Sequence, residues 1–353
     1  MEKALIAMSG GVDSSVAAWL LKKKGYDVTG AMMKLYESND AAAESGCCSA
    51  ADAQDAREVA QRLGIPFYVF NFVDDFAAQV IDRFVRAYQG GATPNPCIDC
   101  NRYLKFERFL RRADELGHQR IATGHYARIT KDGSRWLLKK GLDHSKDQSY
   151  ALYTMTQPQL ARTLFPLGEL SKAQAREIAA EQGLITADKR DSQDICFAPG
   201  GDYAGFIEGY TGTLAVPGPF KDTQGNTLGR HKGIIHYTVG QRKGLGISAG
   251  QPIYVCKLCP QTNTVVLGGQ EELYAKALTA RDINLIAAER LDGPVQVRAK
   301  IRYNQTEQPA KVWQLDEDTL RVEFDQPQRA ITRGQAVVLY DGETIVGGGV
   351  IEG

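Results

Sequence analysis

Short apolar segments with strand character alternate with longer helical segments through the first 200 residues of the chain. The expected strands are Lys3–Met8, Asp27–Met33, Phe67–Asn71 and Arg120–Thr123. The expected helices are Ser14–Lys24, Ala51–Leu63, Phe76–Gln89, Arg102–Leu116 and Ser171–Gln182. Strands that are separated by helices form a parallel sheet with helices on both of its faces. The sequence therefore predicts an α/β fold, in which ligands bind at the carboxyl ends of the strands.

The pattern changes after about residue 210, where glycine and proline separate shorter segments. From Val295 to Tyr303 apolar and polar side chains alternate with period two, which is typical of a half-buried strand. Further strands are expected at Lys311–Leu315, Leu320–Phe324, Ala336–Tyr340 and Thr344–Val350. We expect an α/β catalytic domain at 1–205, a small central β-rich domain at 206–275 and a C-terminal β-barrel at 276–353.

Length and composition exclude several classes of protein. The 353 residues carry 42 basic and 42 acidic side chains, and 43% of them are hydrophobic, which is typical of a folded globular chain. No apolar run approaches the roughly 20 residues of a membrane-spanning helix, and the first residues do not resemble a signal peptide. The seven cysteines are too few for a secreted disulfide scaffold of this length. We therefore expect a cytoplasmic protein that does not bind membranes.

The zero net charge conceals two oppositely charged stretches. Between Glu37 and Asp75 the chain carries eight acidic and two basic side chains, and between Cys97 and Lys146 it carries twelve basic and six acidic ones. A basic stretch can bind a polyanion such as RNA, or it can be an ordinary solvated surface. Charge alone does not decide between the two.

The turn after the first predicted strand reads Ser9-Gly10-Gly11-Val12-Asp13-Ser14-Ser15. Its glycines permit close backbone approach, its serines and aspartate can cap the next helix, and the helix amides can bind an anion. Any tight turn would explain the glycines, and the chain has no Walker motif. The complete order of residues, however, resembles the pyrophosphatase loop of enzymes that split ATP into AMP and pyrophosphate.

Two cysteines are candidates for a reactive thiol. Asn101 is a plausible N-cap of the basic helix that follows it, which would place Cys100 at the positive end of the helix dipole and lower the pKa of its thiol. Cys196 follows the basic pair Lys189 and Arg190. A lone cysteine is more often a small buried hydrophobic residue, so neither position is decisive by itself.

Further motifs follow the turn in a fixed order. They are Asn95-Pro96, Cys100-Asn101, Lys105-Phe106, Thr123-Gly124-His125-Tyr126, Lys146-Asp147-Gln148-Ser149-Tyr150, Ile195-Cys196-Phe197 and Gly240-Gln241-Arg242-Lys243-Gly244-Leu245-Gly246. With this series the chain closely resembles the bacterial tRNA-specific 2-thiouridylases, from its first strand to Gly347-Gly348-Gly349. The resemblance implies an adenine nucleotide alpha hydrolase-like domain and ATP-dependent 2-thiolation of the wobble uridine of tRNA.

The resemblance also implies roles for individual residues. Cys196 would carry a persulfide, Cys100 would be the nucleophilic second thiol that closes a Cys100–Cys196 disulfide, and Asp13 would serve adenylation. ATP, with Mg²⁺ as cofactor, would be bound by Ala7, Met8, Ser9, Gly10, Gly11, Val12, Asp13, Ser14, Met33 and Gly124. The anticodon loop of tRNA would be contacted by Asn95, Pro96, Cys97, Lys146, Asp147, Gln148, Arg302 and Tyr303. The remaining partners would be a protein persulfide donor and a reductant for the disulfide, and the protein would act as a monomer.

Several alternatives stay open. Cys97 stands where many members of the family have aspartate, so Cys97, Cys100 and Cys196 could instead hold a [4Fe–4S] cluster with one open iron, although the two-thiol route is favoured. A small-molecule synthetase with a pyrophosphatase loop and a non-catalytic RNA-binding protein are the rival functions. No metal site is expected, although a zinc site formed by the two Cys-x-x-Cys pairs, Cys97 with Cys100 and Cys256 with Cys259, is a minor alternative. Structural roles are expected for Cys47, Cys48, His125 and His231.

Overall fold

The computed structural model describes residues 1–36, 49–187, 189, 195–248 and 250–353. The chain forms two compact units, which are described separately. Unit 1 comprises residues 1–80, 97–200 and 343–345, and unit 2 comprises residues 81–96, 201–342 and 346–353. Cys47 and Cys48 lie outside the described residues. In the described part of the chain, no helix is both long enough and apolar enough to cross a membrane.

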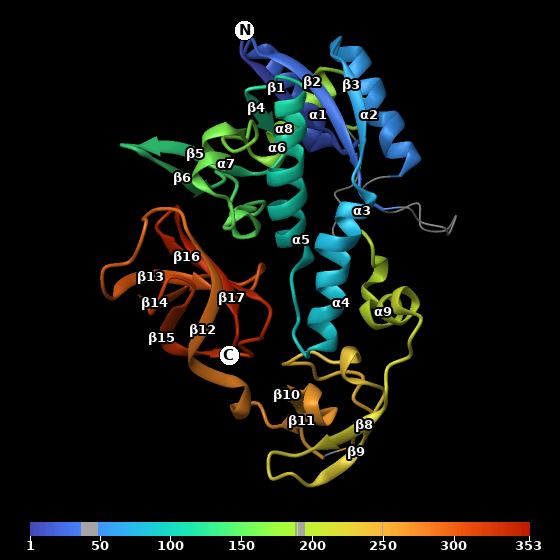
Figure 1. Ribbon diagram of the computed structural model, residues 1–353, viewed down its shortest axis with the longest axis vertical. Helices are drawn as coiled ribbons and strands as arrows, with labels where there is room; N and C mark the ends of the chain where they lie inside the picture. Colours follow the sequence, from blue (N-terminus) through green and yellow to red (C-terminus); the bar gives the residue numbers. More distant parts are fainter. Residues whose placement is uncertain (37–48, 188, 190–194, 249) are drawn as a thin grey trace. The chain divides into compact units, whose positions relative to one another are not determined.

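Unit 1 contains a five-stranded parallel sheet with the strand order β3-β2-β1-β4-β7 (Figure 1). Its strands are β1 (Lys3–Ala7), β2 (Asp27–Lys34), β3 (Phe67–Asn71), β4 (Arg120–Ala122) and β7 (Thr163–Leu164). The parallel α/β fold predicted from the sequence is thereby confirmed. Strand β7 has only two residues, which is too short for a hydrophobic pattern to reveal.

Helices α1 (Val12–Lys23), α2 (Ala50–Leu63) and α8 (Lys172–Glu181) supply the main core of unit 1. Buried side chains of these helices pack with apolar side chains of β1 and β2 in one cluster. Helices α3 (Val73–Phe76), α6 (Phe109–Glu115) and α7 (Gln157–Arg162) and the short 3₁₀ turn η3 (Ser149–Leu152) also belong to unit 1. The antiparallel hairpin of β5 (Ala127–Asp132) and β6 (Arg135–Lys140) was not predicted.

The helix expected at Arg102–Leu116 begins six residues earlier. Helix α5 (Pro96–Asp99) continues into a π-helical segment, η2 (Cys100–Arg108), and then into α6. Proline is favoured in the first turn of a helix because the missing N–H would have no partner there, so Pro96 starts the helix. The prediction that Asn101 is an N-cap was therefore wrong: its carboxamide lies within the helix and donates to the carbonyl oxygen of Ala151 at 2.9 Å.

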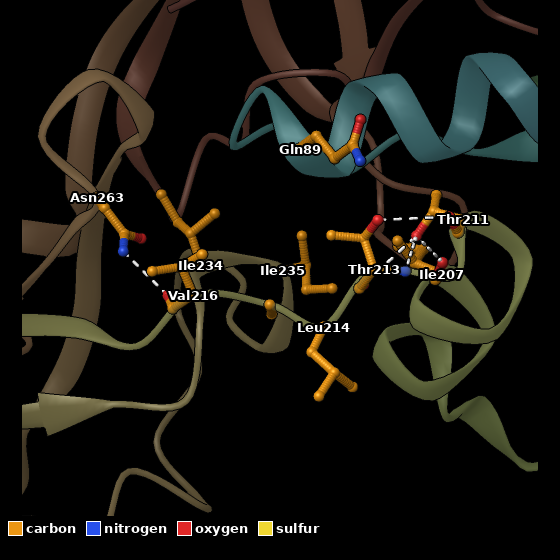
Figure 2. A pocket seen from close by; sticks show the side chains of 10 residues that line it. Gln89, Ile207, Thr211, Thr213, Leu214, Val216, Ile234, Ile235 and Asn263 are labelled. Atoms are coloured by element: carbon orange, nitrogen blue, oxygen red, sulfur yellow. Dashed lines mark hydrogen bonds between the residues drawn. The ribbon is translucent and has the colours of Figure 1, made fainter.

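Unit 2 contains a small sheet and a barrel. The sheet has the order β10-β11-β8-β9, and its strands are β8 (Gly218–Lys221), β9 (Thr227–His231), β10 (Tyr254–Cys259) and β11 (Thr264–Gly268). Helices α4 (Asp82–Gln89) and α9 (Tyr203–Thr211) belong to the same unit. A pocket of about 160 Å³ lies between residues of both helices and the segment after α9, with Ile234, Ile235 and Asn263 on its other side (Figure 2).

The C-terminal barrel predicted from the sequence is confirmed. Its strands pair antiparallel in the order β12-β15-β14-β13-β16-β17, and β12 pairs with β17 as well, which closes the ring. They are β12 (Tyr274–Leu285), β13 (Val295–Lys300), β14 (Gln308–Gln314), β15 (Leu320–Arg329), β16 (Ala336–Asp341) and β17 (Thr344–Ile351). The strand expected to reach Tyr303 ends at Lys300, because the backbone turns there and the Ile301 amide donates to Gln305 Oε1 at 2.9 Å.

Candidate active site

The loop between β1 and α1 leaves the start of the helix without a side-chain cap. The N-cap residue is Gly11, and no side chain in the described part of the chain accepts a hydrogen bond from the first amides of α1. The expectation that serine and aspartate cap this helix was wrong, because the Ser14 and Ser15 hydroxyls donate back to the carbonyl oxygen of Gly11 at 3.1 and 2.9 Å. Amides at an uncapped helix N-terminus are suited to bind an anion such as a phosphate group.

A lysine that pairs with two aspartates contacts the backbone of this loop. Lys189 Nζ donates to the carbonyl oxygen of Gly10 at 3.0 Å, to Asp52 Oδ1 at 2.5 Å and to Asp55 Oδ2 at 2.6 Å. Burial disfavours the ammonium charge, but the hydrogen bonds and charges of the two carboxylates outweigh it and raise the pKa of Lys189. Gly10 has φ +72°, and a Cβ there would lie 2.3 Å from the carbonyl oxygen of Asp52, so only glycine fits this approach.

Asp13, in the first turn of α1, accepts hydrogen bonds from two side chains. Lys172 Nζ lies 2.8 and 2.7 Å from its two carboxylate oxygens, and the Tyr126 hydroxyl donates to Oδ1 at 2.8 Å. Only 11% of the Lys172 side chain is exposed, so this ion pair is partly shielded from water. An ionised carboxylate has about four acceptor sites, so Asp13, whose side chain is 33% exposed, keeps a site for a metal ion or for one of its water ligands.

The predicted ATP residues meet at the carboxyl ends of adjacent strands. Met8 follows β1 and donates through its amide to Ala31 of β2 at 2.8 Å, and Met33 lies near the end of β2 with 8% of its surface exposed. Gly124 follows β4, and a Cβ there would lie 2.9 Å from both Asp13 C and Ser14 N. The turn after β4 therefore packs directly against the start of α1.

Cys100 and Cys196 occupy different elements of unit 1. Cys100 is the first residue of η2 and is buried, whereas Cys196 is partly exposed. The segments that carry the two cysteines both contact α3. Arg108 at the end of η2 pairs with Asp75 at 2.9 Å, and the ring of Phe197, next to Cys196, lies 5.8 Å from that of Phe76 between centroids. Cys97 is exposed in α5. The segment that directly precedes Ile195, residues 190–194, lies outside the described residues.

His125 is a buried imidazole next to the Cys100 helix. Its ring lies 5.9 Å from Phe106 of η2 and 5.8 Å from Phe165 between centroids, and its Nδ1 is 2.7 Å from Thr123 Oγ1. Burial, and to a smaller extent the charge of Lys105, lowers the pKa of His125 well below its usual value. The expected structural role is consistent with this packing.

The predicted tRNA residues Lys146, Asp147 and Gln148 lie in one turn, residues 143–148. Asp147 points into the protein: its Oδ1 accepts from the amides of Gly141 and Ser149 at 3.1 and 3.2 Å, and its Oδ2 accepts from the Ser149 hydroxyl at 2.8 Å. The Gln148 side chain also points inward, because its Oε1 accepts from the Tyr126 amide at 3.0 Å. The Lys146 side chain is half-buried.

The other predicted tRNA residues include four in unit 2. Asn95 and Pro96 follow Thr93, whose amide donates to the Arg333 carbonyl of the barrel at 2.8 Å. Arg302 and Tyr303 lie in the turn after β13. The Arg302 guanidinium donates to the carbonyl oxygens of Arg329 and Ala330, and 40% of Tyr303 is exposed.

The remaining candidates are the cysteines of β10 and the basic stretch. Cys256 and Cys259 both lie on β10 of the β10–β11 hairpin, and burial together with the Glu272 charge raises the pKa of Cys256 to about 11. Among the described residues, no three or more His, Cys, Asp or Glu side chains are grouped so that they could hold a metal ion. Within the basic stretch of unit 1, five arginines pair with acidic side chains; they are Arg108, Arg111, Arg112, Arg120 and Arg128.

Sequence reasoning missed the two lysines and the tyrosine that organise the loop. Lys172 is the first residue of a helix and stands alone in the sequence, so no spacing links it to Asp13, 159 residues earlier. Tyr126 and Lys189 lie within or beside the motifs noted above, but their contacts to Asp13 and Gly10 depend on the fold.

Three family models match successive parts of the chain. They are the tRNA methyl transferase HUP domain at residues 2–200, the tRNA methyl transferase PRC-barrel domain at 204–269 and the aminomethyltransferase beta-barrel domain at 275–351. The fold and the loop thus define an α/β protein of the HUP class, with an uncapped helix N-terminus after its first strand and two β modules.

Curated relatives that match the full length narrow this class. The chain is 51% identical to a protein of Clostridioides difficile (99% of this chain, 98% of that one) and 52% identical to one of Acetivibrio thermocellus (99% of each), both named tRNA-specific 2-thiouridylase MnmA. A relative of that name from Lachnoclostridium phytofermentans is also 52% identical over 99% of each chain. The chain therefore belongs to the tRNA-specific 2-thiouridylase family, which confirms the resemblance.

Solved structures are more distant. A 4-thiouridine synthetase–RNA complex with bound ATP shares 21% identity and a TM-score of 0.38, covering 55% of this chain and 44% of that one. NMN synthetase from Francisella tularensis shares 18% identity and a TM-score of 0.35, covering 61% and 79%. At such TM-scores these similarities add nothing to the assignment.

Proposed function

We propose that this protein is a tRNA-uridine 2-sulfurtransferase, which uses ATP to replace the C2 oxygen of the wobble uridine by sulfur. The observation that carries the proposal is the uncapped start of α1, with Asp13 and Lys172 beside it, in the same unit as Cys100 and Cys196. Full-length relatives at 51% and 52% identity that are named for tRNA 2-thiolation support the substrate and the reaction.

The first step activates an oxygen that is otherwise a poor leaving group. The C2 oxygen of uridine attacks the α-phosphorus of ATP, the uridine loses its N3 proton, and the bond from that phosphorus to pyrophosphate breaks. The uncapped start of α1 supports a role for its amides in binding the leaving pyrophosphate. The proposed ATP-binding residues remain Ala7, Met8, Ser9, Gly10, Gly11, Val12, Asp13, Ser14, Met33 and Gly124.

The second step transfers sulfur between covalent intermediates. The terminal sulfur of a persulfide on Cys196 attacks C2, and the C2–O bond breaks so that AMP leaves. The Cys100 thiolate then attacks Cys196 Sγ. The bond between Sγ and the transferred sulfur breaks, and the transferred sulfur keeps the electron pair. A proton returns to N3 of the uridine. The product is 2-thiouridine and a Cys100–Cys196 disulfide, which an external dithiol reduces.

The proposal extends to partners that lie outside this chain. A protein persulfide donor charges Cys196, and the tRNA anticodon loop is contacted by Asn95, Pro96, Cys97, Lys146, Asp147, Gln148, Arg302 and Tyr303. An unstacked loop base can be bound in a pocket for such chemistry. We further propose that the protein is a cytoplasmic monomer with three domains, whose boundaries lie near residues 205 and 275.

The test combines product analysis with cysteine variants. Purified protein, ATP, Mg²⁺, tRNA, a persulfide donor and a dithiol should yield 2-thiouridine with AMP and pyrophosphate. Cys196→Ser should accept no ³⁵S from the donor, and Cys100→Ser should accept it but fail to turn over. Cys259→Ser is the control and should behave as wild type in both measurements, because Cys259 lies at the end of β10 and has no part in the proposed sulfur transfer.

Two outcomes would contradict the proposal. ADP in place of AMP would exclude adenylation of the base, and labelling of Cys196→Ser would reassign the thiols. The cluster alternative is tested by iron and sulfide content after anaerobic purification. Stoichiometric iron together with an inactive Cys97→Ser variant would replace the persulfide route by the cluster route.

A further inference from the structure

The turn of residues 143–148 is hydrogen-bonded to the backbone of Tyr126 and of Lys172, the two residues whose side chains contact Asp13. The Gln148 side chain accepts from the Tyr126 amide at 3.0 Å, and the Gln148 amide donates to the Tyr126 carbonyl oxygen at 3.0 Å. Both polar groups of the Tyr126 backbone are thus bonded to Gln148. The Tyr126 hydroxyl in turn donates to Asp13 Oδ1 at 2.8 Å.

A second connection starts at the other end of the same turn. Asp143 Oδ2 accepts from the backbone amide of Lys172 at 3.0 Å, and Lys172 is the first residue of α8. The Lys172 ammonium bonds both carboxylate oxygens of Asp13 and lies 5.9 Å from the centre of the Tyr126 ring. Tyr126 and Lys172 therefore form one cluster around Asp13, and residues at both ends of a single turn fix it.

We propose that Tyr126 is a positioning residue for adenylation and that tRNA bound at the 143–148 turn acts on Asp13 through Gln148 and Tyr126. This inference rests on the proposed function and deepens it, because it gives Gln148 a role other than a direct RNA contact. Tyr126 is 2% exposed, so its hydroxyl reaches Asp13 from a fixed ring. A shift of the turn on tRNA binding therefore changes where the Tyr126 hydroxyl meets Asp13, and adenylation is fastest when bound tRNA holds the turn in place.

The experiment measures the single-turnover rate of pyrophosphate release from γ-labelled ATP, together with the tRNA Kd. Tyr126→Phe removes one hydrogen bond to a charged group, and its rate at saturating tRNA should fall roughly tenfold or more while the tRNA Kd stays within about twofold. Tyr26→Phe is the matched control, because Tyr26 follows the opposite end of α1, and it should retain the wild-type rate.

Gln148 variants separate positioning from binding. Gln148→Ala loses the acceptor for the Tyr126 amide and should lower the saturating rate as Tyr126→Phe does. Gln148→Glu keeps an acceptor and should restore that rate at saturating tRNA, although its added charge weakens tRNA binding. A mere loss of fold would not be rescued in this way, and circular dichroism checks that each variant is folded.

The results distinguish this inference from the proposed function. If the wild-type protein releases no pyrophosphate with tRNA, the proposed function fails. If it does, but Tyr126→Phe is as fast as wild type, the positioning role is overturned. A Gln148→Ala variant with a raised tRNA Kd and an unchanged saturating rate would make Gln148 a simple RNA contact and also overturn the inference.

Discussion

Replacing Lys189 by methionine removes a cation from between two carboxylates without removing the aliphatic stem. The variant loses contacts of 2.5 Å to Asp52 and 2.6 Å to Asp55 and the hydrogen bond to Gly10. The exposed fractions are 33% for Lys189, 13% for Asp52 and 32% for Asp55, so the pairs are intermediate between surface and buried ones. Exposed pairs contribute about 1 kcal/mol or less, and breaking a buried pair costs about 3–5 kcal/mol. We expect a loss of about 2–3 kcal/mol.

Thermal unfolding is the assay for this loss. For a domain of the size of unit 1, about 1 kcal/mol corresponds to about 2–4 °C, so the melting temperature of Lys189→Met should fall by about 4–12 °C. Lys24→Met, at an exposed position after α1, is the control and should melt as wild type does. The KM for ATP should rise as well, because the Gly10 carbonyl loses its donor.

The pH dependence provides a check on sign. The folded pKa of Lys189 is raised, so its contribution is fully present below the unfolded pKa of about 10.5 and is lost only as pH rises through the folded value. The difference between wild type and variant should therefore be constant between pH 7 and about 9.5. A melting temperature within about 1 °C of wild type would refute the reasoning. So would a double-mutant cycle with Asp55→Asn that shows no coupling.

Three further predictions concern the same unit. Gly124→Ala should raise the ATP Kd about tenfold or more and leave the tRNA affinity unchanged, because its Cβ would lie 2.9 Å from backbone atoms of Asp13 and Ser14. Calorimetry with each ligand measures both affinities, and ATP binding equal to that of wild type would contradict the packing. The His125 ring should titrate in NMR spectra well below the usual range of histidine, because burial lowers its pKa, and a titration near the ordinary value of 6.5 would argue against a buried ring. Lys146→Ala should reduce the salt slope of tRNA binding by about 1, and an unchanged slope would place the phosphate contact elsewhere.

The parallel strands β1, β2, β3 and β4 could be predicted because each is a short apolar run bounded by turn residues. The hairpin of β5 and β6 was missed although Asp132-Gly133 is a usual turn signal, since its strands carry many charged side chains and expose part of both faces. The long strand β12 was missed for a related reason. Its first three residues are exposed, so polar and apolar side chains do not alternate cleanly along it.

The candidate site was predictable only where it is local in the sequence. The loop from Ser9 to Ser14 and the end of β4 at Gly124 follow from motif and topology together, because adjacent parallel strands end at the same edge. The helix start at Pro96 was missed because Asn101, a residue type that often caps helices, suggested a later start. Lys172 could not be predicted, since its pairing with Asp13 depends on how α8 packs against α1.

The closed ring of the C-terminal barrel determines how unit 2 can meet other molecules. Strand β12 pairs on one side with β15 and on the other with β17, while β17 pairs in addition with β6 at Thr344. Strands β13, β14, β15 and β16 each have a neighbour on both sides, so they offer no free edge on which a second polypeptide could add a strand. A molecule that meets these four strands therefore contacts their side chains and the turns between them, of which the turn after β13 carries Arg302 and Tyr303.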